Sequence, residues 1–220
     1  LQPYPFERLR SLLNGIDHAG ELTHISLSIG EPKHNPPQFV IDELSNPQSL
    51  AKHLATYPTT KGSVVLRTSI SEWLEHRFAV AVDPDISILP VNGTREALFS
   101  VAQALLSGNK DTRVAMPNPF YQIYEGAAIL AGTKPCYLEC LQENNFQPDF
   151  DSIDDTTWQQ CSLIYICSPG NPTGSVMPID VMQKLIHLSD KFDFVIASDE
   201  CYSEIYRDES NPPPGLLQAC

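Results

Sequence analysis

The sequence predicts an α/β protein in which a mostly parallel sheet has helices on both faces. Short apolar segments typical of strands alternate along the chain with segments whose apolar residues recur at helical spacing. Strands that alternate with helices imply right-handed crossovers and parallel pairing. The strand segments are apolar almost throughout, which is typical of a sheet that is covered on both faces.

The alternation begins after residue 62. The expected helices cover 64–79, 94–106, 121–130 and 179–188, and the expected strands cover 86–91, 113–116, 134–138, 162–167 and 194–198. The first sixty residues are punctuated by prolines and are only weakly periodic. We therefore divide the chain into an N-terminal arm with a small-domain segment, residues 1–62, and a large domain, residues 63–220.

The composition excludes several classes of function. The 220 residues carry a formal net charge of −13, which argues against nucleic acid or an anionic membrane as a partner. No apolar run has the length of a membrane span and the N-terminus lacks a signal-peptide core, so we expect a cytoplasmic protein. The six cysteines have no zinc-site spacing, so we expect reduced thiols and no metal.

The segment after residue 91 is a candidate anion site. Gly93 permits close approach of the backbone, and the amides of Thr94 and Arg95 follow at the start of an expected helix. Free amides at a helix N-terminus bind anions such as phosphate. The alternative is that Thr94 simply caps the helix.

Two further strand ends carry polar residues that a core does not need. The loop 167–174 holds Asn171 between Gly170 and Pro172, although two prolines and two glycines could equally form a plain turn. The apolar strand 194–198 leads directly to Asp199, whose carboxylate would be costly to bury without a partner. Ligands bind at the carboxyl ends of strands in such sheets, so we expect the chemistry there.

Taken together, these motifs resemble the fold-type-I aminotransferases of classes I and II, which use pyridoxal 5'-phosphate. NGTREAL at 92–98 is similar to their phosphate-binding turn, and SPGNPTG at 168–174 is followed by Asp199 and Tyr202 as in that family. Segments 119–124, 28–32 and 57–67 resemble their aromatic, substrate and subunit-interface motifs. The resemblance covers residues from about 1 to 209 with the motifs in the family's order.

The resemblance implies roles around the cofactor ring. Asp199 would face the pyridine nitrogen, where two unit charges about 4 Å apart attract by about 4 kcal/mol at an effective dielectric of about 20. That attraction would keep the ring protonated. Asn171 and Tyr202 would reach the phenolic oxygen of the ring, and Tyr121 would stack on its face. Asp199 and Tyr202 would thus be the catalytic residues of this chain.

The resemblance also implies contacts with the phosphate, the substrate and a second subunit. Gly93, Thr94 and Arg95 would surround the phosphate of the cofactor. Gly30 would offer its backbone to the substrate, near Asn171. Tyr57 would reach the phosphate in the neighbouring subunit, so the working unit would be a homodimer.

Within the family, seven segments taken together are most similar to the succinyldiaminopimelate aminotransferase subfamily: 1–10, 26–34, 57–62, 90–99, 117–128, 167–174 and 198–206. This implies N-succinyl-LL-2,6-diaminopimelate and 2-oxoglutarate as substrates, in the biosynthesis of diaminopimelate and lysine. Two alternatives stay open: another reaction of the same cofactor, such as a β-lyase or a decarboxylase reaction, and a catalytically inactive relative.

The sequence departs from the family at one important point. None of its seven lysines follows Asp199, where the family has the lysine that binds the cofactor covalently. The arginine that binds the substrate carboxylate, which the family carries far later in its sequence, is also absent. We therefore expect the chain to be the N-terminal half of a longer protein.

Overall fold

The computed structural model describes residues 4–16, 20–27, 29–31, 33–109 and 111–220. The chain divides into two compact units, Leu1–Pro58 and Thr59–Cys220. The first unit contains three short helices, α1 (Pro5–Leu13), α2 (Gln38–Leu44) and α3 (Pro47–Leu54). None of the three helices has a buried residue, so the described residues of this unit form no buried core.

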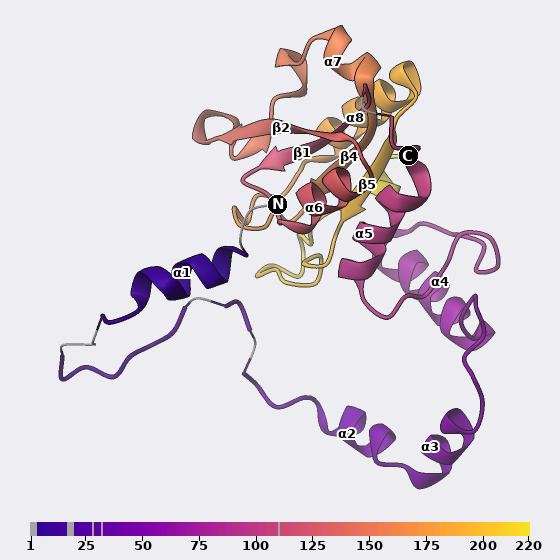
Figure 1. The fold of residues 1–220 in the computed structure, drawn as a ribbon. Coiled ribbons are helices and arrows are strands. Elements are labelled where there is room, and N and C mark those ends of the chain that lie inside the picture. Colours follow the sequence, from indigo (N-terminus) through magenta and orange to yellow (C-terminus); the bar gives the residue numbers. More distant parts are fainter. Residues whose placement is uncertain (1–3, 17–19, 28, 32, 110) are drawn as a thin grey trace. The chain divides into compact units, whose positions relative to one another are not determined.

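The second unit is built on a five-stranded sheet in the order β3-β2-β1-β4-β5 (Figure 1). Its strands are β1 (Arg113–Asn118), β2 (Lys134–Leu141), β3 (Gln147–Pro148), β4 (Cys161–Cys167) and β5 (Val195–Asp199). β1 is parallel to β2 and β4, β4 is parallel to β5, and the two-residue β3 alone pairs antiparallel. The prediction of an α/β fold with a mostly parallel sheet is confirmed.

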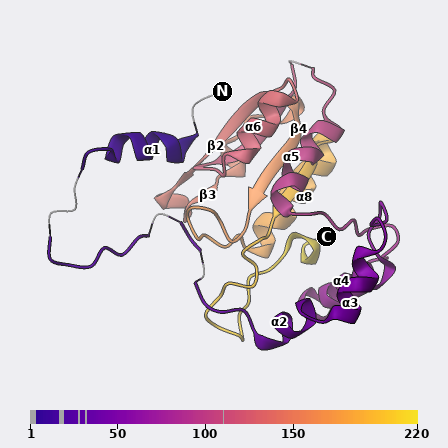
Figure 2. The same ribbon diagram turned by 60° about the horizontal axis from the view of Figure 1, so that its bottom comes forward.

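Helices cover both faces of this sheet, as predicted. The helices of the second unit are α4 (Val64–Phe78), α5 (Thr94–Leu105), α6 (Ile123–Leu130), α7 (Asp155–Gln160) and α8 (Ile179–Phe192). In β4, Leu163 and Tyr165 point to the core under α5 and α6, which Figure 2 shows together on one side of the sheet. The alternate residues Ile164 and Ile166 point to the core under α7 and α8. No helix in the described part of the chain is long and apolar enough to cross a membrane.

The predicted strand at 86–91 is wrong. These residues are irregular, and the side chains of Ile86 and Leu89 are 84% and 65% exposed. A strand forms only when its backbone groups find a neighbouring strand, and β5, at the edge of the sheet, pairs only with β4 among the described strands. The apolar pattern of this segment is therefore present without the pairing that would make it a strand.

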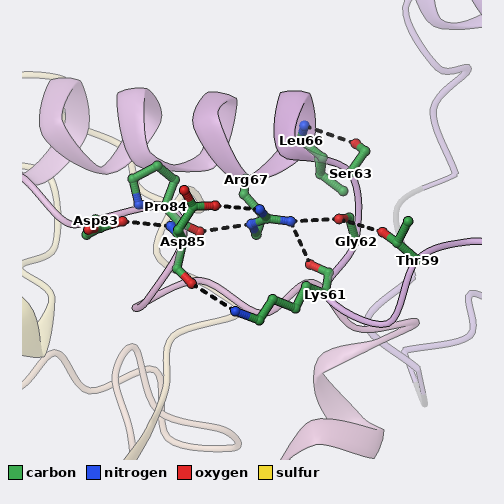
Figure 3. Close-up of polar contacts among 9 residues, drawn as sticks. All are labelled: Thr59, Lys61, Gly62, Ser63, Leu66, Arg67, Asp83, Pro84 and Asp85. Atoms are coloured by element: carbon green, nitrogen blue, oxygen red, sulfur yellow. Dashed lines mark hydrogen bonds and ion pairs between the residues drawn. The ribbon is translucent and has the colours of Figure 1, made fainter.

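A buried arginine holds the start of the second unit together (Figure 3). Arg67 in α4 is 5% exposed. Its guanidinium group donates to the carbonyl oxygens of Lys61 and Gly62 at 3.2 and 2.7 Å, and to that of Pro84 at 2.9 Å. The last contact is an ion pair with Asp85 at 2.6 Å. One side chain thus fixes the turn before α4 and the loop after it, because both supply acceptors to the same group.

Candidate functional site

Three of the predicted site residues of the second unit lie at or just beyond the carboxyl ends of strands. Tyr121 lies just beyond β1, Asn171 lies in the loop after β4, and Asp199 is the last residue of β5. Cys167 of β4 is in register with Asp199, and the amide of Ser168 donates to the carbonyl of Asp199 at 3.1 Å. The chain continues from β1 to β2 and β3 on one side of it and then returns to place β4 on the other side. The strand order thus reverses between β1 and β4, and α/β sheets bind ligands at such switch points.

Asp199 is a buried carboxylate with two hydrogen-bond donors. It is 6% exposed, and its Oδ2 accepts from the hydroxyl of Tyr124 at 2.6 Å. Its Oδ1 accepts from the amide of Cys201 at 3.4 Å. Among the described residues no cation forms an ion pair with it. This position of a carboxyl group, without a cation beside it in the described structure, fits a contact with a protonated ring nitrogen.

An open pocket of about 360 Å³ connects this carboxylate with the N-terminus of α5. Thr94 and Asp199 both line it, together with Trp73 and Phe78 of α4. Within the described structure no side chain caps α5, and a Cβ placed on Gly93 would meet nothing within 4 Å. The start of α5 thus has no side-chain cap and is open on the side of Gly93, which fits the anion site predicted for Gly93, Thr94 and Arg95.

Asn171 and Tyr202 lie together at a second, neighbouring pocket of about 270 Å³. The loop that carries Asn171 is tightly turned, because the amide of Gly170 donates to Ser175 at 2.8 Å and that of Gly174 donates to Gly170 at 2.7 Å. Burial, and then the nearby cysteines, Asp199 and Tyr121, raise the pKa of the Tyr202 hydroxyl. That hydroxyl is accordingly a proton donor at neutral pH.

Tyr121 and Tyr124 belong to one aromatic cluster at this edge of the sheet. Their rings meet edge to face, with centroids 5.9 Å apart and planes at 88°. Tyr121 is partly exposed, whereas Tyr124 is fully buried. The partly exposed ring is the one predicted to stack on the cofactor.

The other two predicted contacts lie in the first unit. Tyr57 is 98% exposed, and Gly30 is also exposed. Ser28 and Pro32 of the substrate motif lie outside the described residues. The roles of Tyr57 and Gly30 therefore stay predictions.

The sequence-based site lacks two buried tyrosines that lie behind it, of which Tyr124 contacts a site residue and Tyr165 does not. Tyr124 binds Asp199, and Tyr165 in β4 donates from its hydroxyl to the carbonyl of Leu98 in α5 at 2.6 Å. A signal for Tyr124 was available, because it follows Tyr121 by three residues and such positions share one face of a helix. Tyr165 had no such signal, since it lies within an apolar strand.

A buried carboxylate, an uncapped helix N-terminus and a partly exposed aromatic ring beside one parallel sheet form a set of groups that suits a phosphorylated aromatic ligand. The chain belongs to the aminotransferase class I and II family, whose family model matches residues 23–218. The resemblance seen in the motifs is thereby confirmed, and the family implies pyridoxal 5'-phosphate as the cofactor.

Relatives and solved structures agree with this assignment. The chain is 32% identical over 218 residues to an LL-diaminopimelate aminotransferase of Nitratidesulfovibrio vulgaris (strain DP4), covering 99% of this chain and 55% of that protein. An aminotransferase structure from Neisseria meningitidis Z2491 superposes with a TM-score of 0.90 at 45% identity, covering 100% of this chain and 55% of that one. The structure of aminotransferase AspB from Helicobacter pylori 26695 superposes with a TM-score of 0.89 at 36% identity, covering 100% of this chain and 56% of that one. The chain spans about half the length of the curated relatives it matches.

Proposed function

We propose that the full-length protein is a pyridoxal-phosphate-dependent aminotransferase that moves an amino group between an amino acid and a 2-oxo acid. The observation that supports this most strongly is the pocket shared by Asp199 and Thr94. A pocket that is lined both by a carboxylate and by the first residue of a helix suits the ring nitrogen and the phosphate of one cofactor molecule.

Four side chains would hold and tune the ring. When bound, the cofactor supplies an aldehyde that takes up the amino group and a ring that withdraws electrons from the substrate. Asp199 holds a proton at the ring nitrogen, which increases that withdrawal. Asn171 and Tyr202 donate hydrogen bonds to the phenolic oxygen, and Tyr121 fixes the plane of the ring by stacking.

The remaining predicted residues would bind the phosphate and complete the assembly. The amides of Thr94 and Arg95 bind the phosphate, and Gly93 keeps the approach open because it has no side chain. Tyr57 binds the phosphate in the partner subunit of a homodimer. Gly30 presents its backbone to the substrate beside Asn171.

For the amino donor, we propose a diaminopimelate derivative. The names of the relatives support LL-diaminopimelate, whereas the sequence motifs favour the N-succinyl form. The two donors carry the same reacting α-amino acid end, and differ at the far end, where one has an ammonium group and the other a succinylated amide. We favour N-succinyl-LL-2,6-diaminopimelate, with 2-oxoglutarate as the acceptor.

The test is an assay of the full-length protein for glutamate formed from 2-oxoglutarate with each donor. We expect the N-succinyl donor to have the higher kcat/KM. A higher kcat/KM with free LL-diaminopimelate would show that this is the amino donor and would leave the proposed aminotransferase function in place. If the protein bound the cofactor but released carbon dioxide or an eliminated β-substituent instead of forming glutamate, aminotransfer would be rejected.

A further inference from the structure

Two buried tyrosines connect the two regions that would hold the ends of the cofactor. Tyr124 of α6 and Tyr165 of β4 are both 0% exposed, and their rings stack with centroids 4.6 Å apart and planes at 9°. Each hydroxyl makes a 2.6 Å hydrogen bond, Tyr124 to Asp199 and Tyr165 to the carbonyl of Leu98 in α5. The pair therefore runs from the end of β5 to the helix whose N-terminus faces the pocket.

The surroundings of Tyr124 leave it one orientation. Its ring is enclosed by Tyr165 on one face and met by the edge of Tyr121. Its hydroxyl must end on an acceptor, because a buried hydroxyl without a hydrogen bond is costly. The acceptor is Asp199, a carboxylate that lines the pocket, and Cys167 is a second neighbour of the hydroxyl. A phenylalanine would fill the same space, so packing alone does not explain the hydroxyl.

The hydroxyl of Tyr124 remains a donor at all physiological pH. Burial, the neighbouring Cys167 and the hydrogen bond to Asp199 all raise the pKa of Tyr124 far above its ordinary value. A group with a raised pKa keeps its proton until the pH exceeds that value, so the bond to Asp199 does not switch off near neutrality. By contrast, the second donor to Asp199, the amide of Cys201, is at 3.4 Å and is weaker.

We propose that Tyr124 is a positioning residue for Asp199. Its hydroxyl fixes the rotation of the carboxylate, which lines the pocket and would hold the ring nitrogen there. The stack with Tyr165 keeps the hydroxyl in place. This proposal rests on the proposed function, because it assigns Tyr124 to the residue that would hold the ring proton.

The experiment compares Tyr124→Phe with Tyr165→Phe in the full-length protein. Each variant loses one buried hydroxyl with a 2.6 Å hydrogen bond and keeps the stacked ring, but only Tyr124→Phe affects Asp199. The measurements are the dissociation constant of pyridoxal phosphate from the cofactor-free protein, kcat and KM for the amino donor, and the melting temperature. A merely structural role would lower the melting temperature of both variants and leave the other values similar between them.

We expect the dissociation constant to rise about tenfold in Tyr124→Phe, which corresponds to the loss of one hydrogen bond to a charged group. In Tyr165→Phe we expect a rise of less than about threefold with a comparable loss of melting temperature. We also expect kcat to fall in Tyr124→Phe with KM nearly unchanged, because Asp199 acts on the reacting ring and not on the substrate.

The outcomes separate this inference from the proposed function. A wild-type protein that bound no pyridoxal phosphate and transaminated no amino acid would overturn both. If the wild-type protein bound pyridoxal phosphate and transaminated an amino acid, but Tyr124→Phe and Tyr165→Phe had equal dissociation constants and equal kcat values, the positioning role alone would be overturned.

Discussion

Gly62 lies so close to Pro90 that a Cβ added to it would stand 2.8 Å from the Cγ of the proline. Its φ of +74° is also in the left-handed region that favours glycine. We expect Gly62→Ala to lower the free energy of unfolding of the full-length protein by about 3 kcal/mol, from backbone strain and steric overlap together. Urea unfolding followed by circular dichroism measures this.

The matched control is Gly174→Ala. Gly174 has a similar φ of +71°, but its Cβ would meet nothing within 4 Å. Only the backbone strain of the left-handed conformation remains, so we expect Gly174→Ala to lower the free energy of unfolding by about 1 kcal/mol. Equal losses of unfolding free energy in Gly62→Ala and Gly174→Ala would show that Pro90 moves away from the added Cβ and that the close approach does not affect stability.

The buried guanidinium of Arg67 should matter far more than its ion pair. Arg67→Lys keeps the charge but cannot serve the carbonyl oxygens of Lys61, Gly62 and Pro84 together, so we expect a loss of about 3 kcal/mol in unfolding free energy. The carboxylate of Asp85 is 70% exposed, so Asp85→Asn should cost less than about 1 kcal/mol. The same urea titration compares them, and a larger loss in Asp85→Asn would reverse this ranking.

We expect the charge of Asp199 to affect the rate of the reaction, measured as kcat, and not the folding of the protein. Asp199→Asn keeps the size of the side chain and an acceptor for Tyr124 but removes the charge. We expect kcat of the full-length protein to fall roughly a thousandfold, in proportion to about 4 kcal/mol of lost charge interaction. Asp193→Asn, at an exposed position six residues earlier, should leave kcat unchanged. Near-normal turnover in Asp199→Asn would remove Asp199 from the proposed site.

Tyr57 should serve the active site of the partner subunit. If so, mixing inactive Tyr57→Phe and Asp199→Asn proteins produces heterodimers in which one site has both defects and the other has none. At equal mixing we expect roughly a quarter of the wild-type activity to return, because half of the dimers are mixed and each has one intact site. If subunits exchange, as native mass spectrometry can verify, and no activity returns, Tyr57 does not act across the interface.

Most helices and strands of the second unit could be predicted because their signals are local. The apolar periodicity of 64–79 and the apolar run 162–167 coincide with α4 and β4 to within a residue. The segment 86–91 has an equally apolar pattern, yet it is irregular. Apolar periodicity indicates which side chains are buried. A strand also requires a neighbouring strand to pair with, and the sequence of one segment does not show whether such a neighbour exists.

The sequence by itself determined the order of the motifs, the α/β class, the family and five residues that the fold brings to one edge of the sheet: Thr94, Tyr121, Asn171, Asp199 and Tyr202. Each of these is marked by its immediate neighbours, at the end of a strand or the start of a helix. Only the tertiary structure decided that Tyr124 bonds to Asp199, 75 residues away, and that Tyr165 bonds to Leu98, 67 residues away. Such contacts depend on how strands pair and helices pack, and no local pattern in the chain encodes the distance between two side chains that meet only after folding.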